Sequence, residues 1–387
     1  MSTTDAGAAA ITLTEAELDR YVTHAPTRGL LTGPGLPPDS GLLTFSPLRT
    51  DGLRTLADAM DGPGRLAEEL RDRLVIGELL GPAGTERESI LLDGGTGEIT
   101  TAYLFGPTTP RPLAPSLSTL LRFAAVTEEL TSLRGRFTRL AGQYGTKTAT
   151  EASRRLLALF EEGTDGEVPP YWKAAALIRP LALVVGPGTA VSGLALDVPG
   201  RLLDQEFGPG RMARYEEVDF PATLTHEPTR RFLRETGLPE DAVLFHTDTD
   251  VPLPTLTEYF TDERAGDYPL DDLPAHADHL IRLGHLVEDN SLVVDGTTGA
   301  VLNFSEPDAA LYPLNTDVST LAFTLWLLHH ERMIDHHLAH ELTTEAYDQL
   351  AATMLQVLSS LDPTGTTPDT DWHYWTELFQ DEAGGVL

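Results

Sequence analysis

The sequence of 387 residues contains no cysteine. This absence excludes disulfide frameworks, thiolate nucleophiles and cysteine-based zinc sites. Long apolar runs are missing too: the longest candidate, Leu321 to Leu328, has the length of a core helix and is too short to cross a bilayer. The first ten residues lack the basic start and apolar stretch of a secretory signal. We therefore expect a cytoplasmic protein with no membrane partner.

Basic residues are scarce. Lys and Arg number 27 against 59 Asp and Glu, which gives a formal net charge of −32. Such a field repels nucleic acid and anionic lipid and attracts basic surfaces. A nucleic-acid-binding protein should carry a basic face, so we expect no nucleic-acid partner. The apolar content of 41% is normal for a folded globular protein, and the length suffices for two domains.

The chain contains an internal repeat. Residues 23–28 (THAPTR) correspond to residues 225–230 (THEPTR), and residues 93–97 (DGGTG) correspond to residues 295–299 (DGTTG), both at an offset of 202. Three shorter matches keep the same order at offsets that differ by at most one: Gly35-Leu36-Pro37 with Gly237-Leu238-Pro239, Ser118-Thr119-Leu120 with Ser319-Thr320-Leu321, and Tyr171-Trp172 with Tyr374-Trp375. Solenoids and propellers have much shorter periods, so the repeat indicates two copies of a whole domain.

The boundary between the copies is expected in a run rich in glycine, residues 186–193. This divides the chain into a diverged first domain of residues 1–185, a linker of residues 186–193 and an acidic second domain of residues 194–387. The acidity is uneven. Residues 1–193 contain 23 acidic and 18 basic side chains, a net charge of −5, whereas residues 194–387 contain 36 and 9, a net charge of −27. Nearly all the excess negative charge therefore belongs to the second copy.

The pattern of the second copy predicts an α+β fold. A helix capped by Thr225 is expected to run to Gly237, and strands are expected at residues 241–245, 280–287, 291–294 and 300–304. Two helices follow, the first capped by Asp317, and an aromatic segment, residues 372–379, closes the copy. Because the strands are grouped, we expect a mixed or mostly antiparallel sheet packed with helices. The first copy follows this plan, but Gly29, Gly33 and Pro34 predict a poor first helix there.

The landmarks shared by the copies are better explained by structure than by catalysis. Asp93 and Asp295 precede hairpin glycines, where an Asp side chain stabilises the turn by accepting backbone N–H bonds. No Gly-x-Ser-x-Gly elbow or kinase signature is present, and residues 186–193 lack the lysine of a phosphate loop. We therefore expect no catalytic residue and no cofactor. The structural landmarks are Gly35, Pro37, Asp93, Gly97, Gly237, Pro239, Asp295 and Gly299.

Residues 329–341 (HHERMIDHHLAHE) contain five histidines on a predicted helix. His336 and His340 are four apart and share a helix face, a spacing at which histidine pairs bind metals. The zinc-protease motif needs a glutamate directly after the first histidine, and His337 stands there instead. The equivalent stretch of the first copy, residues 127–144, contains no histidine. We expect a polar helix end without metal, and a metal site at His336 and His340 is the remote alternative.

The order of several motifs resembles the SUKH superfamily, and most closely its fourth immunity-protein family. The resemblance rests on residues 231–239 (RFLRETGLP), Leu283-Gly284, the turn at residues 295–299, Leu314-Asn315 with Ser319, and a closing tryptophan. It covers residues 213–387 and, more faintly, residues 11–185. It implies two tandem α+β domains and a bacterial protein that binds and neutralises a toxin. Partners in that superfamily are often nucleases or nucleic-acid deaminases, while related domains elsewhere act as regulatory scaffolds.

The sequence therefore predicts a non-enzymatic immunity protein whose second copy binds a cognate toxin with a basic surface. A regulatory or scaffold module without a toxin is the first alternative, and a metal-dependent enzyme built on the histidine cluster is the remote one. Binding groups tend to lie on loops, so the contact is expected at acids that flank predicted loops of the second copy. These acids are Asp248, Asp250, Asp262, Glu263, Asp267, Asp271 and Asp272.

Overall fold

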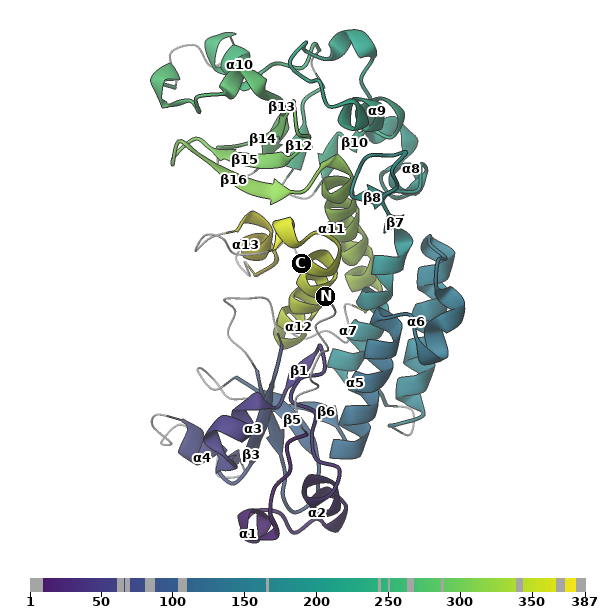
Figure 1. Cartoon of the computed structure of the whole chain (residues 1–387), viewed down its shortest axis with the longest axis vertical. Coiled ribbons are helices and arrows are strands. Elements are labelled where there is room, and N and C mark those ends of the chain that lie inside the picture. The colour runs from purple at the N-terminus through teal and green to yellow at the C-terminus, as the bar shows by residue number, and fades with distance from the viewer. Residues whose placement is uncertain are drawn as a thin grey trace, which may run out of the picture. The chain divides into compact units, whose positions relative to one another are not determined.

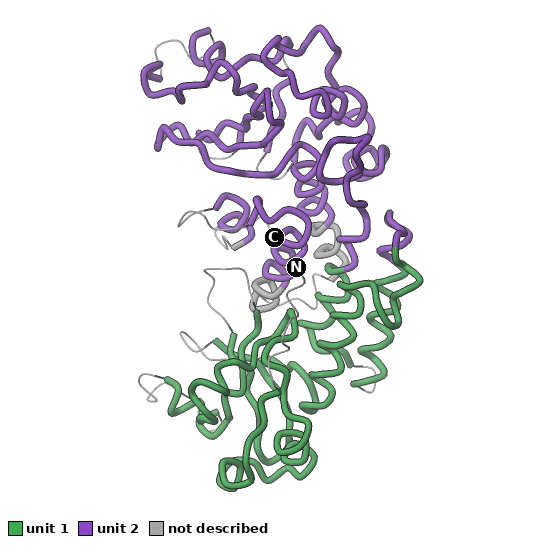
Figure 2. Tube along the Cα trace, viewed as in Figure 1, with its two compact units in different colours: residues 1–141, 151–179 green, residues 142–150, 180–387 purple. Residues whose placement is uncertain are grey.

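The computed structural model describes residues 10–60, 66, 70–80, 88–103, 110–164, 167–242, 245–249, 251–262, 268–286, 289–338, 344–366 and 373–380, without the side chains of residues 331–338, 344–349 and 380. The chain divides into two compact units (Figure 2). Unit 1 comprises residues 1–141 and 151–179, and unit 2 comprises residues 142–150 and 180–387. No helix within the described ranges is long and apolar enough to cross a membrane.

Unit 1 is an antiparallel sheet with helices packed on it. Its strands are β1 (Leu43–Thr44), β2 (Arg54–Thr55), β3 (Leu74–Leu79), β4 (Ser89–Leu92), β5 (Ile99–Ala102) and β6 (Arg111–Ala114), in the order β1-β3-β4-β5-β6 with β2 also on β3. Its helices are α1 (Glu15–Leu18), α2 (Ala25–Thr32), α3 (Ser46–Asp51), α4 (Leu56–Ala59), α5 (Leu117–Thr131), most of α6 (Thr146–Glu161) and α7 (Pro170–Ile178). Phe123, Phe160 and Trp172 from α5, α6 and α7 form an aromatic cluster with ring centroids 4.7 to 5.4 Å apart.

Unit 2 repeats this architecture. Its main sheet runs β11 (Asp241–Ala242), β12 (Phe245–Thr247), β13 (Leu280–Leu286), β14 (Asn290–Asp295), β15 (Val301–Ser305) and β16 (Ala310–Asn315) in chain order, with every neighbouring pair antiparallel. Strands β9 (Met212–Ala213) and β10 (Leu238–Pro239) form a small second pair. The helices are α8 (Leu202–Phe207), α9 (Glu227–Glu235), α10 (Leu256–Asp262), α11 (Val318–Leu338), α12 (Thr344–Leu361) and α13 (Tyr374–Gln380) (Figure 1). The predicted α+β fold with two tandem copies is confirmed.

The two copies agree down to the pairing of single residues. The bridge from Ile11 to Leu36 recurs as Ala213 to Leu238, again at an offset of 202. Asp39 opposite Thr44 recurs as Asp241 opposite His246. Strands β3 and β13 each carry a bulge next to a glycine, Gly77 or Gly284. A Cβ atom at either glycine would collide with a backbone carbonyl oxygen, that of Thr44 or that of His246. Glycine therefore lets the neighbouring strand approach at this point in both copies.

The repeated motif of residues 23–28 and 225–230 ties the first helix of each copy to its hairpin turn. The backbone N–H groups of Thr23 and His24 both donate to the carbonyl oxygen of Gly94, at 2.8 and 2.9 Å. Those of Thr225 and His226 do the same to Gly296, at 2.7 and 2.9 Å. Each histidine ring contacts the hydroxyl of the threonine three residues on, at 2.8 Å. The motif is thus a structural clasp, repeated in both copies.

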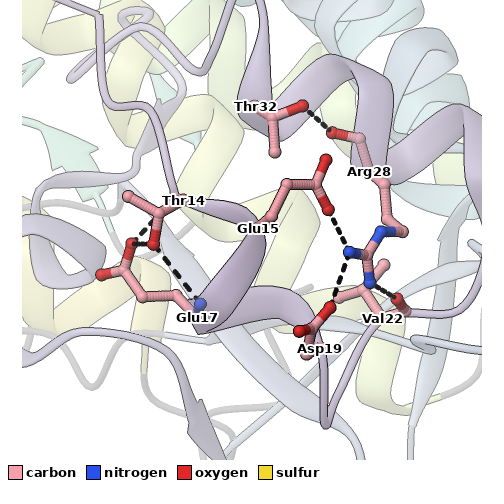
Figure 3. A network of polar contacts seen from close by, with 7 residues as sticks. All are labelled: Thr14, Glu15, Glu17, Asp19, Val22, Arg28 and Thr32. Carbon is pink, nitrogen blue, oxygen red and sulfur yellow. Dashed lines mark hydrogen bonds and ion pairs between the residues drawn. The ribbon is translucent and has the colours of Figure 1, made fainter.

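An arginine completes this clasp. Arg28 donates to the carbonyl oxygen of Val22 at 2.9 Å and pairs with the carboxylates of Glu15 and Asp19 (Figure 3). Arg230 repeats two of these contacts, with Leu224 and Glu217. The segment before the clasp begins with matching capping boxes, Thr14 with Glu17 in the first copy and Glu216 with Asp219 in the second. The side chains that hold the first turn of the fold are therefore equivalent in the two copies.

The first helix of the first copy is better formed than its glycines predicted. Helix α2 spans eight residues against nine for α9. Gly33 lies just beyond the end of α2. Gly29 lies within α2, but nothing lies within 4 Å of the position that its Cβ atom would take, so the missing side chain removes no packing contact. The predicted cap at Thr225 is also wrong, since the helix begins after His226 and the Thr225 hydroxyl donates instead to the Gly296 carbonyl at 3.3 Å. Tertiary bonds to the hairpin therefore replace a side-chain cap.

The turn and cap chemistry predicted downstream is present. The Asp295 carboxylate accepts the backbone N–H groups of Thr297 and Thr298 at 2.9 and 2.7 Å, and Asp93 does the same in the first copy. Gly97 and Gly299 adopt φ values of 82° and 79° there. Asp317 caps α11 by accepting the N–H of Ser319 at 2.8 Å. These bonds fix the two hairpin turns and the start of α11.

Residues 186–193 form part of a hairpin in unit 2. Strand β7 (Gly186–Pro187) pairs with β8 (Leu196–Asp197), and Gly188 donates to the Ala195 carbonyl at 2.7 Å. The hairpin is bound to α9 by Arg231, which donates to the Ser192 carbonyl at 3.0 Å. It is bound to the start of α11 by the N–H of Ala195, which donates to Asp317 at 2.6 Å. The segment belongs to the fold of the second unit.

Candidate functional site

The acids predicted to bind the partner fall mainly on one segment of unit 2. Asp262 ends α10, and Asp271 and Asp272 form the short 3-10 helix η7 (Leu270–Asp272). All three side chains are exposed. Asp250, Glu263 and Asp267 lie outside the described residues. Asp262, Asp271 and Asp272 therefore belong to one segment of the chain, residues 256–280, of which residues 256–262 and 268–280 are described; we call it the acidic segment.

The acidic segment packs on the sheet through a hydrophobic cluster. Leu256 and Phe260 of α10, with Ala277, pack on the sheet residues Val293 and Phe304. Phe260 and Phe304 meet edge to face at 5.9 Å between ring centroids. Helix α10 starts at Thr255, whose hydroxyl accepts the N–H of Glu258 at 3.2 Å while the Glu258 carboxylate accepts the Thr255 N–H at 2.8 Å. The exposed acids therefore lie on a segment whose buried side chains pack against the sheet.

The corresponding segment of the first copy is less acidic in sequence. This segment also begins at a capping threonine, Thr55, whose hydroxyl accepts the N–H of Asp58 at 3.1 Å. From that point residues 56–73 carry five acids and three bases, a net charge of −2. Residues 256–280 carry seven acids and one base, a net charge of −6. The same position in the fold has therefore become longer and more acidic in the second copy.

Asp248 differs from Asp262, Asp271 and Asp272 because its carboxylate forms an ion pair within unit 2. Its carboxylate pairs with the guanidinium of Arg282, a side chain that is only 5% exposed. Arg282 also donates from Nε to Ser291 at 3.2 Å and lies over the Tyr259 ring, 3.8 Å from its centroid. In the first copy Val75 occupies the matching strand position. A buried cation needs such a partner, so Asp248 holds Arg282 in the core.

The histidine cluster has a structural role where it is described. His329 and His330 both place Nδ1 within 3.2 Å of the Glu206 carboxylate of α8, and Trp326 stacks on His330 at 4.7 Å. Burial raises the pKa of Glu206, but the bonds and charges of His330 and His329 hold it below its ordinary value. No three described side chains are grouped to hold a metal ion. The side chain of His336, and all of His340, lie outside the described residues.

A buried polar network closes unit 2 on the side of α12 and α13. Asn315 at the end of β16 donates to Asp362 at 3.0 Å and to Thr324 at 3.2 Å, and it accepts the Trp375 indole N–H at 3.0 Å. In the first copy the Trp172 indole donates to the backbone carbonyl of Leu113 at 2.9 Å. Each of these groups in the second copy is hydrogen-bonded to another, so the network contributes to fixing the fold.

His373 makes this network sensitive to acid. Its Nε2 donates to the Thr364 carbonyl at 2.9 Å, while Nδ1 is buried and has no hydrogen-bond partner. Burial lowers the pKa of His373 and outweighs the effects of the Thr364 bond and the Asp362 charge, which raise it. The unfolded chain therefore takes up the proton first as the pH falls. The stability from neutral His373 is present above about pH 6.5 and is lost below it.

We expect the replacement of His373 by Gln to weaken this pH dependence. Gln keeps a donor for the Thr364 carbonyl but does not titrate. Between pH 7.5 and pH 5.5 the wild-type chain should lose more unfolding free energy than the variant, because only the wild-type chain has a group whose pKa is lower in the folded state. Urea denaturation at the two pH values measures the difference. An equal loss in both proteins would mean that His373 is not the titrating group.

Sequence reasoning missed two exposed valines. Val218 is 78% exposed and Val251 is 54% exposed, and they lie on short segments of unit 2 between polar residues. Single valines in such segments give no periodic signal, because neither segment is long enough for a helix or strand pattern. Whether the two valines lie close together depends on contacts between segments that are about 30 residues apart in the chain, and only the fold reveals such contacts.

The comparison with protein families gives one match that covers most of the chain. The model of the SUKH-4 immunity protein family matches residues 5–161 and again residues 198–381. The two matched regions fall within the two copies identified from the repeat. No curated protein and no solved structure matches the chain.

Proposed function

This chain belongs to the SUKH-4 immunity protein family, and we propose that it protects a bacterial cell by binding a cognate toxin through the acidic segment of its second copy. The family implies an immunity protein and therefore a toxin as partner. Neutralisation by binding needs no catalytic group: a bound protein need only cover or distort the toxin's working surface.

The observation that carries the assignment to the acidic segment is the contrast between the copies. Both copies keep the capping threonine and the strands around this segment, so the fold does not require extra charge there. The second copy nevertheless has a net charge of −6 in residues 256–280, and Asp262, Asp271 and Asp272 are exposed. Exposed like charges repel one another and do not stabilise the monomer. A basic partner would relieve that repulsion and would be attracted from a distance.

The kind of toxin that fits this surface is an enzyme that acts on nucleic acid. Nucleases and nucleic-acid deaminases bind a polyanion in a basic groove. An acidic protein segment can occupy such a groove as a mimic of the substrate. The net charge of −27 in residues 194–387 would steer such a toxin toward the second copy.

The test is protection of cells. Where a neighbouring gene encodes a toxin, that toxin is expressed from an inducible promoter with and without this chain, and its inactive form is used to measure binding by the purified proteins. We expect survival only with this chain and a complex that weakens as salt rises, since salt screens exposed charges. A chain that neither protects nor binds would contradict the proposal, and affinity independent of salt would contradict the acidic interface.

A further inference from the structure

Two surface segments of unit 2 are tied together at both ends. One consists of residues 215–219 and includes the 3-10 helix η6 (Glu217–Asp219), and the other consists of residues 248–253. The Tyr215 hydroxyl donates to the Asp248 carbonyl at 2.6 Å, and the N–H of Leu253 donates to the Asp219 carbonyl at 2.9 Å. The described residues between these ties therefore lie on neighbouring stretches of surface, and Asp250 lies outside the described residues.

Each of the two stretches carries an exposed valine, Val218 in one and Val251 in the other. Within the described part of the chain, exposed large apolar side chains are few: Tyr144, Val191, Val218, Val251 and Leu270. One such side chain is ordinary on a protein surface. Because their segments are tied together at both ends, we infer that Val218 and Val251 make one apolar spot, and the exposure of such a spot to water is unfavourable.

Buried side chains pack in the two segments that carry the valines. Tyr215 and Phe220 are buried with ring centroids 6.3 Å apart, and Leu253 is 1% exposed. Glu216 and Asp219 accept each other's backbone N–H groups in the capping box. The two valines are therefore held on an ordered surface, and a partner would pay little entropy to bind it.

The first copy shows that the fold does not need a valine at this position. Its capping box, Thr14 with Glu17, holds the same backbone turn, and Ala16 stands where the second copy has Val218. Both side chains are exposed. The copies share the capping box here, although the turn is α-helical in the first copy and a 3-10 helix in the second, and they differ in apolar surface. The second copy, which has the acidic segment, is also the one with the larger exposed side chain.

The apolar spot adjoins the acidic segment along the chain. Val251 is followed by buried Leu253 and by Thr255, which caps α10, the first helix of the acidic segment. Glu216, beside Val218, is exposed. A small apolar centre next to acids is the arrangement of a binding surface, in which apolar anchors supply affinity and the charged surroundings supply attraction and orientation.

We propose that Val218 and Val251 are apolar anchors for the toxin, seated on an apolar spot of a protein whose surrounding surface is basic. This inference rests on the proposed function and extends its interface from the acidic segment to residues 215–219 and 248–253. The toxin is the occupant because residues 194–387 carry a net charge of −27, which attracts a basic protein and repels a second copy of this acidic chain.

The experiment compares the full-length chain with the variants V218S, V251S and their double variant, using the catalytically inactive toxin encoded beside this gene as the probe. We expect the double variant to bind about tenfold more weakly or worse. The loss should be the same at low and high salt because no charge changes. V218A, which restores the residue of the first copy, should lose part of the affinity. The thermal unfolding midpoints should not move, since both side chains are exposed.

The matched control is V191S, because Val191 is 81% exposed and lies in the hairpin of β7 and β8. Wild-type affinity for the double variant, or an equal loss in V191S, would overturn this inference. If the valine variants bind normally while neutralisation of the acidic segment abolishes binding, the proposed function stands and the anchors are wrong. If the wild-type chain does not bind the toxin, the proposed function fails and this inference fails with it.

Discussion

Replacement of Gly284 by valine should abolish protection against the toxin, whereas the same replacement at Gly77 should leave protection intact. A Cβ at Gly284 would collide with the backbone carbonyl of His246, and one at Gly77 would collide with that of Thr44. A carbonyl in the adjacent strand can move only if the pairing of the two strands is disrupted. Each variant should therefore lose about 3 kcal/mol of stability in its own copy.

The two glycine variants form a matched pair because the lesion is the same and only the copy differs. Hydrogen exchange should show that G284V loses protection at β12, β13 and β14, and that G77V loses it at β3 and β4. Survival of cells that express the toxin then reports which copy is needed. If G77V abolished protection as fully as G284V, the first copy would be part of the working interface.

The second large effect is expected from the charge of the acidic segment. The triple variant D262N, D271N and D272N removes three exposed negative charges without removing side-chain volume. Attraction between exposed charges acts mainly on the association rate. We expect the triple variant to associate with the toxin about 10 to 100 times more slowly at low salt, with a smaller difference at high salt.

The control for the triple variant is E161Q, E162Q and E167Q. These side chains of the first copy are exposed, and the variant makes the same change in net charge. Stopped-flow association at several salt concentrations distinguishes the two. An equal loss of rate in both triple variants would mean that only the total charge of the chain matters and that the acidic segment is not the interface.

The sequence predicted the parts of this fold that depend on local chemistry. The Asp295 turn, the Asp317 cap and the grouped strands follow from residue types within a few positions of one another, and the repeat doubled each signal. The sequence also showed that most of the excess acidic residues belong to the second copy. These features could be found because each depends on neighbours in the chain.

What the sequence missed depends on contacts between distant residues. The pairing of Asp248 with Arg282 joins residues 34 apart, and it removes one predicted acid from the set of free charges. The bond from Tyr215 to Asp248 spans 33 residues and ties together the two segments that carry Val218 and Val251. The hairpin at residues 186–197 is held by Asp317, more than 120 residues away. No local pattern encodes such bonds.

The capping threonines have a consequence for how such a protein can change. Thr55 and Thr255 start equivalent helices, and each helix leads to the strand that pairs beside its threonine. Everything between these fixed points can be lengthened or recharged while the sheet and the clasp remain as they are. The segment can therefore differ between the copies while the strands on either side of it stay the same. An immunity protein whose toxin changes can vary this segment in one copy while the other copy stays unchanged.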